Sequence, residues 1–395
     1  MRTVESQLAE IRARSLFRTL HAVETPQQPE ISSGGVALIN FSSNDYLGLA
    51  ADPILREAAK ASIDQWGVGA GASRLICGTL GPHAQLERDL AAFKKAEGAL
   101  GFSSGYSTAV GTLGALAGPE DVIILDKLAH ASLIDGARLS QATLRVFPHN
   151  HLGKLESHLR WARETVPEGR IIVVTESVFS MDGDRSPVEE IVAMKNRYGA
   201  MLLLDEAHAI GVIGDHGRGL ADQRGVASMV DIQMGTLGKA LGSAGGYICA
   251  RKAIIELVVN RARSFIYSTA PLPAAAAAAS AAVAFLQTPA GGGRQEALWQ
   301  RIGDFMREAP ERLLSPGPVQ SAIIPLIIGE EERALAASQW LREKGFLVPA
   351  IRYPTVARGT ARLRVTLSAT HTKEQVGALC SALGRLTAES MKAEV

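Results

Sequence analysis

The sequence predicts an α/β protein with a large, doubly wound and mainly parallel sheet of seven strands, followed by a smaller C-terminal α+β domain and preceded by a helical arm. Three observations support this. Apolar runs alternate with helical patterns from residue 86 onward, several of the runs are continuous, and polar or glycine-rich residues follow them. Continuous apolar runs are typical of strands buried on both faces, as in a parallel sheet covered by helices.

The N-terminal segment 4–20 predicts an amphipathic helix, because its apolar residues stand among many charges at nearly helical spacing. A loop rich in Pro, Gln, Ser and Gly follows over 24–35, then a short strand and turn over 37–49 and a helix over 53–66. We assign residues 1–45 to an N-terminal arm.

The large domain is expected over 46–285. Its predicted strands are 99–101, 122–126, 144–147, 171–175, 201–205, 232–235 and 246–249. Capped helices lie between them, such as 187–198, which ends before Gly199. An alanine-rich helix over 271–286 closes this domain.

The small domain is expected over 286–395. It begins with a loop of sequence TPAGGG at 288–293. Its predicted strands and helices are 323–328, 331–344, 363–368 and 373–386.

Composition excludes several classes of protein. The 395 residues carry 41 Lys+Arg against 40 Asp+Glu, so no basic field exists for a nucleic-acid partner. The apolar stretch 271–286 is mostly alanine in mid-chain and indicates a buried helix, not a membrane span, and no signal peptide is expected. Three scattered cysteines fit neither a disulfide framework nor a zinc site, so we expect a cytoplasmic protein without a metal.

The segment GFSSGY at 101–106 passes from a short strand into a helix. Free amides at that helix N-terminus, with small residues that allow close approach, can hold a phosphate group. The alternative is an ordinary strand-to-helix turn. The segment has no Walker lysine and no complete dinucleotide fingerprint.

The apolar run MLLLDEAH at 201–208 delivers Asp205 and His208 to the edge of the sheet. A carboxylate there can pair with a protonated ring nitrogen, and the imidazole can donate to a nearby oxygen. The alternative reading is an aspartate that caps the next helix.

Lys239 stands in GTLGKALGSAGG without an acidic neighbour, as a desolvated Schiff-base lysine would. The alternative is a surface lysine in a flexible loop. In TESVFSMDGD at 175–184 the ligand spacing of a calcium loop is absent, and a turn with Ser180 facing the cleft is the simpler interpretation. A phosphate cradle, a carboxylate and a lysine together are what pyridoxal phosphate (PLP) requires.

Other candidates have plainer interpretations. His149 and His151 can bind a metal only in an extended segment, and Asn150 favours a solvated turn. His83 suits either a contact to an acyl substrate or the start of a helix. Cys77 and Cys249 are expected to be small core residues.

Over nearly its whole length the chain resembles the α-oxoamine synthase group of fold type I PLP-dependent enzymes. The matching segments include NFSSNDYLGL (40–49), GAGASRLICGTLGPHAQLE (69–87), DKLAHASLIDG (126–136), DEAHAIGVIG (205–214), GTLGKALGSAGGY (235–247) and IRYPTVARGTARLRVTLSATHT (351–372). Two departures from the group are Tyr353, where proline is usual, and GTLGPH, which lacks a first histidine.

The resemblance implies that Lys239 forms the Schiff base and acts as the base, Asp205 pairs with the pyridine nitrogen and His130 stacks on the ring. His208 also belongs to the catalytic set. It implies further cofactor contacts from Ser180, His208, Gly105, Tyr106 and Thr236 and, across a homodimer, from Ser268 and Thr269. On the substrate side it implies that Arg364 and Asn44 bind the amino-acid carboxylate, while Thr355 and Arg18 lie beside the acyl group.

The resemblance also implies the reaction, a decarboxylative condensation of an amino acid with an acyl thioester. The segment TLSATHT favours the members that join L-alanine to a pimeloyl thioester, carried by CoA or a carrier protein, in biotin biosynthesis. Other members use glycine or serine with a different acyl-CoA, and this alternative stays open. An inactive PLP-fold partner subunit is opposed by the joint presence of Lys239, Asp205, His208, His130 and Arg364, and a nicotinamide dehydrogenase is opposed by the missing fingerprint.

Overall fold

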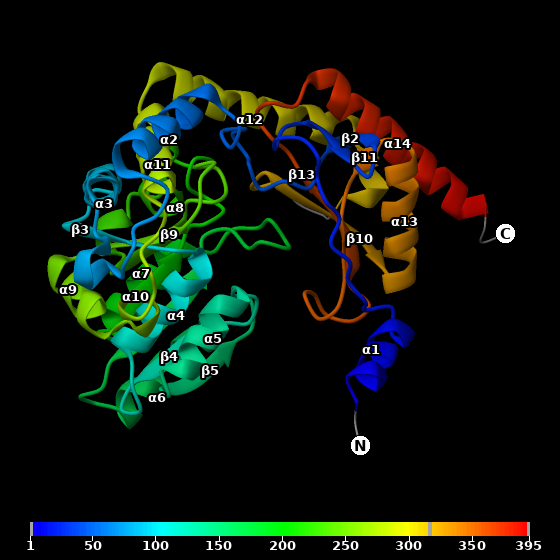
Figure 1. The fold of residues 1–395 in the computed structure, drawn as a ribbon. Helices are drawn as coiled ribbons and strands as arrows, with labels where there is room; N and C mark the ends of the chain where they lie inside the picture. Colours follow the sequence, from blue (N-terminus) through cyan, green and yellow to red (C-terminus); the bar gives the residue numbers. More distant parts are fainter. Residues whose placement is uncertain (1–2, 315–317, 393–395) are drawn as a thin grey trace. The chain divides into compact units, whose positions relative to one another are not determined.

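The computed structural model describes residues 3–314 and 318–392, which fall into two compact units (Figure 1). The sheet unit comprises 45–180 and 184–296. The terminal unit comprises the described residues of 1–44, 181–183 and 297–395. The predicted domain limits of 1–45, 46–285 and 286–395 stay a prediction.

The sheet unit contains the predicted seven-stranded sheet. Its strands in spatial order are β3 (Gly98–Phe102), β9 (Gly246–Ala250), β8 (Ile232–Thr236), β7 (Met201–Asp205), β6 (Ile171–Glu176), β4 (Val122–Asp126) and β5 (Thr143–Phe147). β9 runs antiparallel to both its neighbours, and the other pairs are parallel. Each predicted strand ends within one residue of the observed one. Six of these strands are buried along nearly their whole length, which gives a strong apolar signal, whereas the edge strand β5 is largely exposed.

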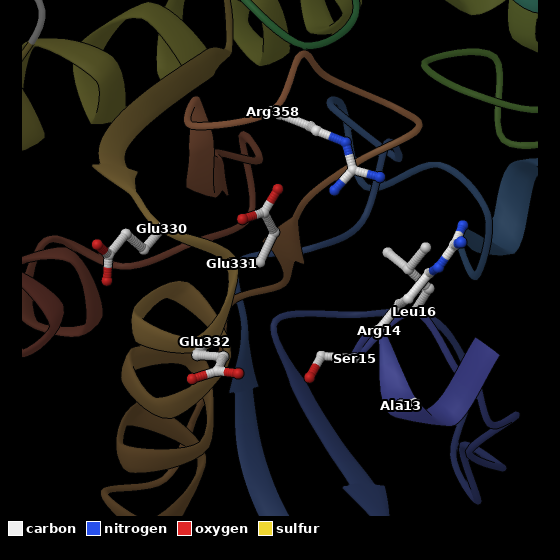
Figure 2. A pocket seen from close by; sticks show the side chains of 8 residues that line it. All are labelled: Ala13, Arg14, Ser15, Leu16, Glu330, Glu331, Glu332 and Arg358. Atoms are coloured by element: carbon white, nitrogen blue, oxygen red, sulfur yellow. The ribbon is translucent and has the colours of Figure 1, made fainter. Parts of the chain in front are cut away.

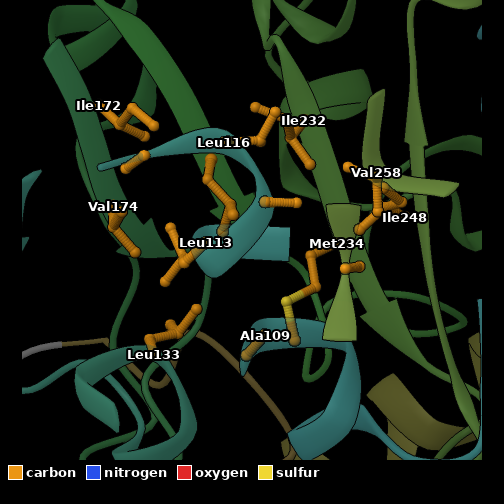
Figure 3. Packing of buried hydrophobic residues seen from close by; sticks show 14 of the residues in the cluster. Ala109, Leu113, Leu116, Leu133, Ile172, Val174, Ile232, Met234, Ile248 and Val258 are labelled. Atoms are coloured by element: carbon orange, nitrogen blue, oxygen red, sulfur yellow. The ribbon is translucent and has the colours of Figure 1, made fainter. Parts of the chain in front are cut away.

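The main core of this unit lies on one face of the sheet. Alternate strand residues such as Ile172 and Val174 pack there against α4 (Gly105–Leu116), whose Leu113 and Leu116 are buried (Figure 3). The intervening residues, such as Val173 and Leu204, are equally buried on the other face. Because both faces are apolar, burial alone does not fix the strand register, and a slip of one residue would still leave a core while moving every polar residue at the strand ends.

Nine further helices complete the sheet unit: α2 (Pro53–Trp66), α3 (Gly81–Phe93), α5 (Ala131–Leu139), α6 (Leu152–Thr165), α7 (Val188–Arg197), α8 (Leu220–Gln223), α9 (Lys252–Arg261), α10 (Arg263–Ile266) and α11 (Pro273–Leu286), as counted over the described residues. α4 packs on α5, α9 and α10, while α11 packs on α2 and α3. The alanine-rich segment is therefore a core helix of this unit, as predicted.

The terminal unit holds α1 (Val4–Ala13) and two small sheets. One is ordered β1 (Glu30–Ser33), β2 (Val36–Asn40) and β11 (Phe346–Leu347); the other is ordered β10 (Ile323–Gly329), β13 (Ala361–Thr366) and β12 (Ala350–Ile351). α13 (Glu331–Glu343) and α14 (Lys373–Lys392) follow the pattern expected of an α+β domain.

Two predicted elements are wrong. The first helix ends at Ala13 and not at residue 20, because Ser15 takes a left-handed conformation. Helices usually end this way at a glycine, and the sequence has none at this position. The predicted loop 288–293 is the start of α12 (Pro289–Glu308). Thr288 caps it by accepting from the Gly291 amide at 3.2 Å, and Pro289 follows at a first-turn position that suits proline.

Gly291 is required at this corner, because a Cβ there would overlap the carbonyl oxygen of Phe285.

Throughout the part of the chain that the structure describes, no single helix has both the length and the apolar composition to cross a membrane. α11 and α12 pass that test only as a pair, bent by 83° at their junction.

Candidate active site

The carboxyl ends of β6 and β7 bring two acidic side chains side by side. Glu176 and Asp205 end these strands in register, and both are almost fully buried. Burial raises the pKa of Asp205, and the charge of Lys239 opposes this. Burial, followed by the neighbouring Asp205, raises the pKa of Glu176 well above its usual value. Both carboxyl groups are therefore harder to ionise than ordinary ones, and the charge of Lys239 favours the ionised form of each.

Lys239 lies in the loop between β8 and β9 and contacts His208 directly. Its Nζ is 2.9 Å from His208 Nε2, and the other ring nitrogen, Nδ1, is 2.5 Å from the hydroxyl of Tyr46. Tyr46 is fully buried and His208 nearly so. The predicted surface-lysine alternative is therefore wrong, because Lys239 is half-buried at the end of a chain of hydrogen-bonding groups.

His130 stands between β4 and α5 as the N-cap of that helix. Its backbone N–H donates to Glu176 at 2.6 Å, and its Nδ1 is 2.7 Å from the Ser132 hydroxyl. Burial lowers the pKa of His130, and Lys239 lowers it further while Asp205 raises it. These electrostatic interactions place the imidazole near both residues, and the lowered pKa favours the neutral ring.

The N-terminus of α4 offers two amides that its own first turn does not use. Ser104 caps the helix by accepting from the Ser107 amide at 3.0 Å, so the amides of Gly105 and Tyr106 point outward. Thr236 is close, since a Cβ on Gly105 would lie 3.7 Å from its hydroxyl oxygen. The Tyr106 hydroxyl donates to Asp135 at 2.7 Å, so the part of Tyr106 that is available to bind an anion is its backbone amide.

Ser180 follows β6 in a turn and is partly exposed. Ser268 and Thr269 follow α10; the Ser268 hydroxyl donates to the Thr269 carbonyl at 3.2 Å, and Thr269 bridges to Ser73. Their reach to a phosphate across a dimer stays a prediction.

In the terminal unit, two predicted substrate residues meet. Arg364 is buried on β13 and donates to Asn44 Oδ1 at 3.1 Å and to the Thr366 hydroxyl at 2.9 Å. Arg18 Nη2 lies 3.5 Å from the Thr355 hydroxyl, so the predicted acyl-side pair is also brought together.

The residues of the sheet unit fit PLP. A buried carboxylate suits a protonated ring nitrogen, a half-buried lysine beside His208 suits an aldehyde, and amides at a helix N-terminus suit a phosphate. Gly246 packs against this helix end, because a Cβ there would overlap Thr108 Oγ1 and lie 2.8 Å from the Gly105 Cα. The lack of a side chain at Gly246 thus lets β9 approach the start of α4 closely.

Sequence reasoning missed two residues that this site uses. Tyr46 lies within the matching segment 40–49, and Glu176 directly follows the strand 171–175, so both signals were present. A third buried group, Lys94, pairs with Glu206 and also donates to the Arg218 carbonyl. This pair lies next to Asp205 in sequence, and Glu206 accepts as well from the Ala221 amide at 3.0 Å.

Three other predictions are resolved by the structure. His149 sits in the expected turn but is not simply solvated: its ring nitrogens bond Asp126 at 3.0 Å and Asp184 at 2.8 Å. His83 stands at the start of α3, where its ring bonds the Leu80 amide and the Pro271 carbonyl. Cys77 is exposed, contrary to the prediction, because it lies in the surface turn 74–78, while Cys249 is buried as predicted.

Comparison with known proteins agrees with this geometry. The family model for aminotransferase class I and II matches residues 36–383. A protein of Geobacter sulfurreducens named 8-amino-7-oxononanoate synthase is 42% identical over 98% of both chains. A protein of the same name from Anaeromyxobacter sp. (strain Fw109-5) is 47% identical over 96% of this chain and 94% of its own length.

Solved structures show the same fold. A serine palmitoyltransferase of Sphingomonas wittichii superposes with a TM-score of 0.91 at 31% identity, covering 97% of this chain and 96% of its own. A structure of SPT with a PLP internal aldimine has a TM-score of 0.90 at 29% identity, covering 98% and 97%. The 8-amino-7-oxononanoate synthase of Francisella tularensis has a TM-score of 0.76 at 28% identity, covering 91% and 99%.

Proposed function

The chain belongs to the aminotransferase class I and II family, and we propose that it catalyses the reaction for which its curated relatives are named, the 8-amino-7-oxononanoate synthase reaction. In this reaction L-alanine and a pimeloyl thioester condense, and carbon dioxide and a free thiol are released. The protein is a PLP-dependent acyltransferase of biotin biosynthesis. The two curated relatives of that name are 42% and 47% identical to it, whereas the solved structures, which include both serine palmitoyltransferases and the synthase of Francisella tularensis, are 28–31% identical.

The observation that carries the proposal is the contact of 2.9 Å between Lys239 Nζ and His208 Nε2 beside the buried Asp205. Bound PLP would supply an electron-withdrawing ring that accepts the electron pair released at the α-carbon of alanine. Asp205 would hold the proton on the ring nitrogen, and His130 would lie over the ring face. The amides of Gly105 and Tyr106, with Thr236, would bind the phosphate.

Lys239 would act on the proton of the alanine α-carbon. Its Nζ would remove that proton, and His208, 2.9 Å away, orients the amine and is oriented in turn by Tyr46. Ser180 would lie beside the ring oxygen with His208. The planar guanidinium of Arg364, already bonded to Asn44, would bind the alanine carboxylate through two parallel hydrogen bonds.

The remaining roles concern the acyl group and the assembly. Thr355 and Arg18 would lie beside the acyl chain, where Arg18 can meet the far carboxylate of a pimeloyl group. Ser268 and Thr269 would reach the phosphate of a partner chain in a homodimer. Neither nucleic acid nor a membrane is a partner in this proposal, and we place the enzyme in the cytoplasm.

A second candidate is the condensation of serine with a long-chain acyl thioester. It is favoured by one observation, the TM-score of 0.91 with a serine palmitoyltransferase. Arg18 opposes it, since a fatty acyl chain offers no far carboxylate for this guanidinium.

The test is thiol release by the PLP-loaded enzyme with alanine, glycine and serine, each combined with pimeloyl, succinyl, acetyl and palmitoyl thioesters. We expect alanine with pimeloyl to give the highest kcat/KM, and the product mass to match loss of carbon dioxide. A higher value for serine with palmitoyl, or for glycine with succinyl, would show that the proposed substrates are wrong.

A further inference from the structure

The N-terminal arm has little packing of its own. α1 buries none of its side chains. Its end is fixed by the amide of Ser15, which donates to the Arg12 carbonyl, and by the amide of Leu16, which donates to the Ile11 carbonyl, both at 3.0 Å. These bonds are internal to the arm, so residues 15–18 need another anchor to keep a defined place.

Arg352 supplies that anchor. Its Nε donates to the Ser15 carbonyl and its Nη2 to the Phe17 carbonyl, both at 2.9 Å. The guanidinium presents these two donors in a fixed plane, so one side chain grips two carbonyls that are two residues apart. Arg352 directly follows β12, which is paired with β13, so the grip originates from a sheet.

The same residue also fixes Thr355, because the Thr355 amide donates to the Arg352 carbonyl at 3.0 Å. Both members of the Arg18–Thr355 pair therefore depend on Arg352, one through its side chain and the other through its backbone. The bond between the pair is long, at 3.5 Å, and Arg18 is exposed. Among the described residues Arg18 forms no ion pair with a carboxylate.

Charge favours an anion on this side of the arm. Partial burial, and then the nearby charge of Arg18, lower the pKa of Arg352, so two guanidinium groups stand close together. A groove of about 370 Å3 lies along residues 13–16 of the arm, and it is a poorer place for an anion (Figure 2). Three glutamates line it, Glu330, Glu331 and Glu332, against two arginines, Arg14 and Arg358, and Arg14 is already paired with Glu10.

We propose that Arg352 is a positioning residue for acyl selectivity: by holding the carbonyls of Ser15 and Phe17 it places Arg18 to bind the far carboxylate of a dicarboxylic acyl thioester. This inference rests on the proposed function. Residues 15–18 and 352–355 then act together, and they select acyl thioesters whose chain carries a second carboxylate.

The test compares Arg352→Lys with Arg358→Lys. Lysine keeps the charge but cannot bond both carbonyls. Arg358 is the control in the same loop: it stacks on Tyr353 at 4.3 Å and, although it lines the groove beside residues 13–16, it forms no hydrogen bond with the described residues of the arm. The substrates are pimeloyl and heptanoyl thioesters, which have equal chain length and differ in the far carboxylate. We expect the ratio of their kcat/KM values to fall about tenfold or more in Arg352→Lys and to stay unchanged in Arg358→Lys, with the KM for alanine unaltered in both.

A second readout needs neither cofactor nor turnover. In the PLP-free protein, trypsin should cut after Arg14 and Arg18 faster in Arg352→Lys than in Arg358→Lys. An unchanged substrate ratio, or a changed ratio with unchanged cleavage, would overturn the positioning role. If the wild-type enzyme prefers an acyl group without a second carboxylate, the proposed function fails, and the cleavage rates still decide whether Arg352 holds the arm.

Discussion

The catalytic edge of the sheet unit and the N-terminal arm are held in opposite ways. At the sheet edge, His208 is buried and both its ring nitrogens are engaged, and the backbone of His130 is tied to Glu176. In the arm, α1 buries no side chain and a single guanidinium grips the segment that follows it. The proposed function thus assigns the chemistry to rigid, over-determined positions and the choice of substrate to a segment with few polar contacts.

This contrast predicts two kinds of variant. Changes at the sheet edge should affect every acyl substrate equally, because in the proposed function the groups there act on the α-carbon of the amino acid. Changes at the arm should affect one acyl group more than another and leave the reaction with alanine intact. Each prediction below tests one side of this comparison.

The largest effect is expected for Lys239→Ala. Loss of the amine removes both the Schiff-base partner and the base, so thiol release should fall by about three orders of magnitude or more with every acyl thioester. The fold should persist, which circular dichroism and the melting temperature will check. Activity above about a hundredth of the wild-type value would contradict the role assigned to Lys239.

Tyr46→Phe should give the next largest effect, and Tyr247→Phe is its matched control. Both tyrosines are fully buried, but Tyr46 bonds His208, whereas the Tyr247 hydroxyl has no hydrogen-bond partner among the described residues. We expect Tyr46→Phe to lower kcat about tenfold and to cost about 1 kcal/mol or more in unfolding free energy. Tyr247→Phe should be neutral or slightly stabilising in denaturant titrations. Equal behaviour of the two variants would show that the Tyr46 bond does not orient His208.

The sequence predicts the sheet edge better than the arm, and the reason is physical. Strands buried on both faces leave a strong local pattern, so β4 (Val122–Asp126) and β7 (Met201–Asp205) are predicted to the residue. The end of α1 has no such signal, since Ser15 adopts a conformation that usually marks glycine. The three glycines at 288–293 suggest a loop. Only the fold shows that Gly291 lies in a helix, where its backbone packs against the Phe285 carbonyl and leaves no room for a side chain.

Site residues follow the same division. Asp205, His208 and Lys239 stand beside apolar runs, so their position at the sheet edge is readable from the sequence. The contacts between Tyr46 and His208, and between Arg352 and the arm, join residues 162 and more than 300 positions apart in the chain. Contacts at such separations depend on the tertiary fold, and no local pattern predicts them.

Two histidines, the half-buried His149 of the sheet unit and the buried His371 of the terminal unit, should give pH dependences of opposite sign. Burial lowers the pKa of His149, but its bonds to Asp126 and Asp184 outweigh this and raise the pKa to about 10. Its contribution to stability is therefore complete below about pH 6.5, the ordinary histidine value, and is lost as the pH rises toward 10. Burial lowers the pKa of His371 to about 4, so stability is lost as the pH falls from about 6.5 to 4.

The measurement is unfolding free energy against pH for wild type, His149→Gln and His371→Gln. The difference between wild type and His149→Gln should shrink between pH 7 and 10. His371→Gln should weaken the loss of stability between pH 6.5 and 4. A constant difference for His149→Gln over the alkaline range would mean that this imidazole is not charged in the folded protein.

The smallest effect is expected for Ser15→Gly, with Asn150→Gly as its counterpart in the sheet unit. Both residues have positive φ, 55° and 53°, a conformation that glycine adopts without strain. Asn150 also bonds Asp184 and the Arg185 carbonyl, so its replacement should destabilise the protein despite the relief of strain. The Ser15 side chain forms no such bond among the described residues, so Ser15→Gly should stabilise the end of α1 by at most about 1 kcal/mol. Tryptic cleavage after Arg18 should then slow by up to about fivefold, the rate factor for that free energy, while the melting temperature stays constant because α1 buries no side chain. Faster cleavage in Ser15→Gly would mean that the left-handed turn does not limit the order of the arm.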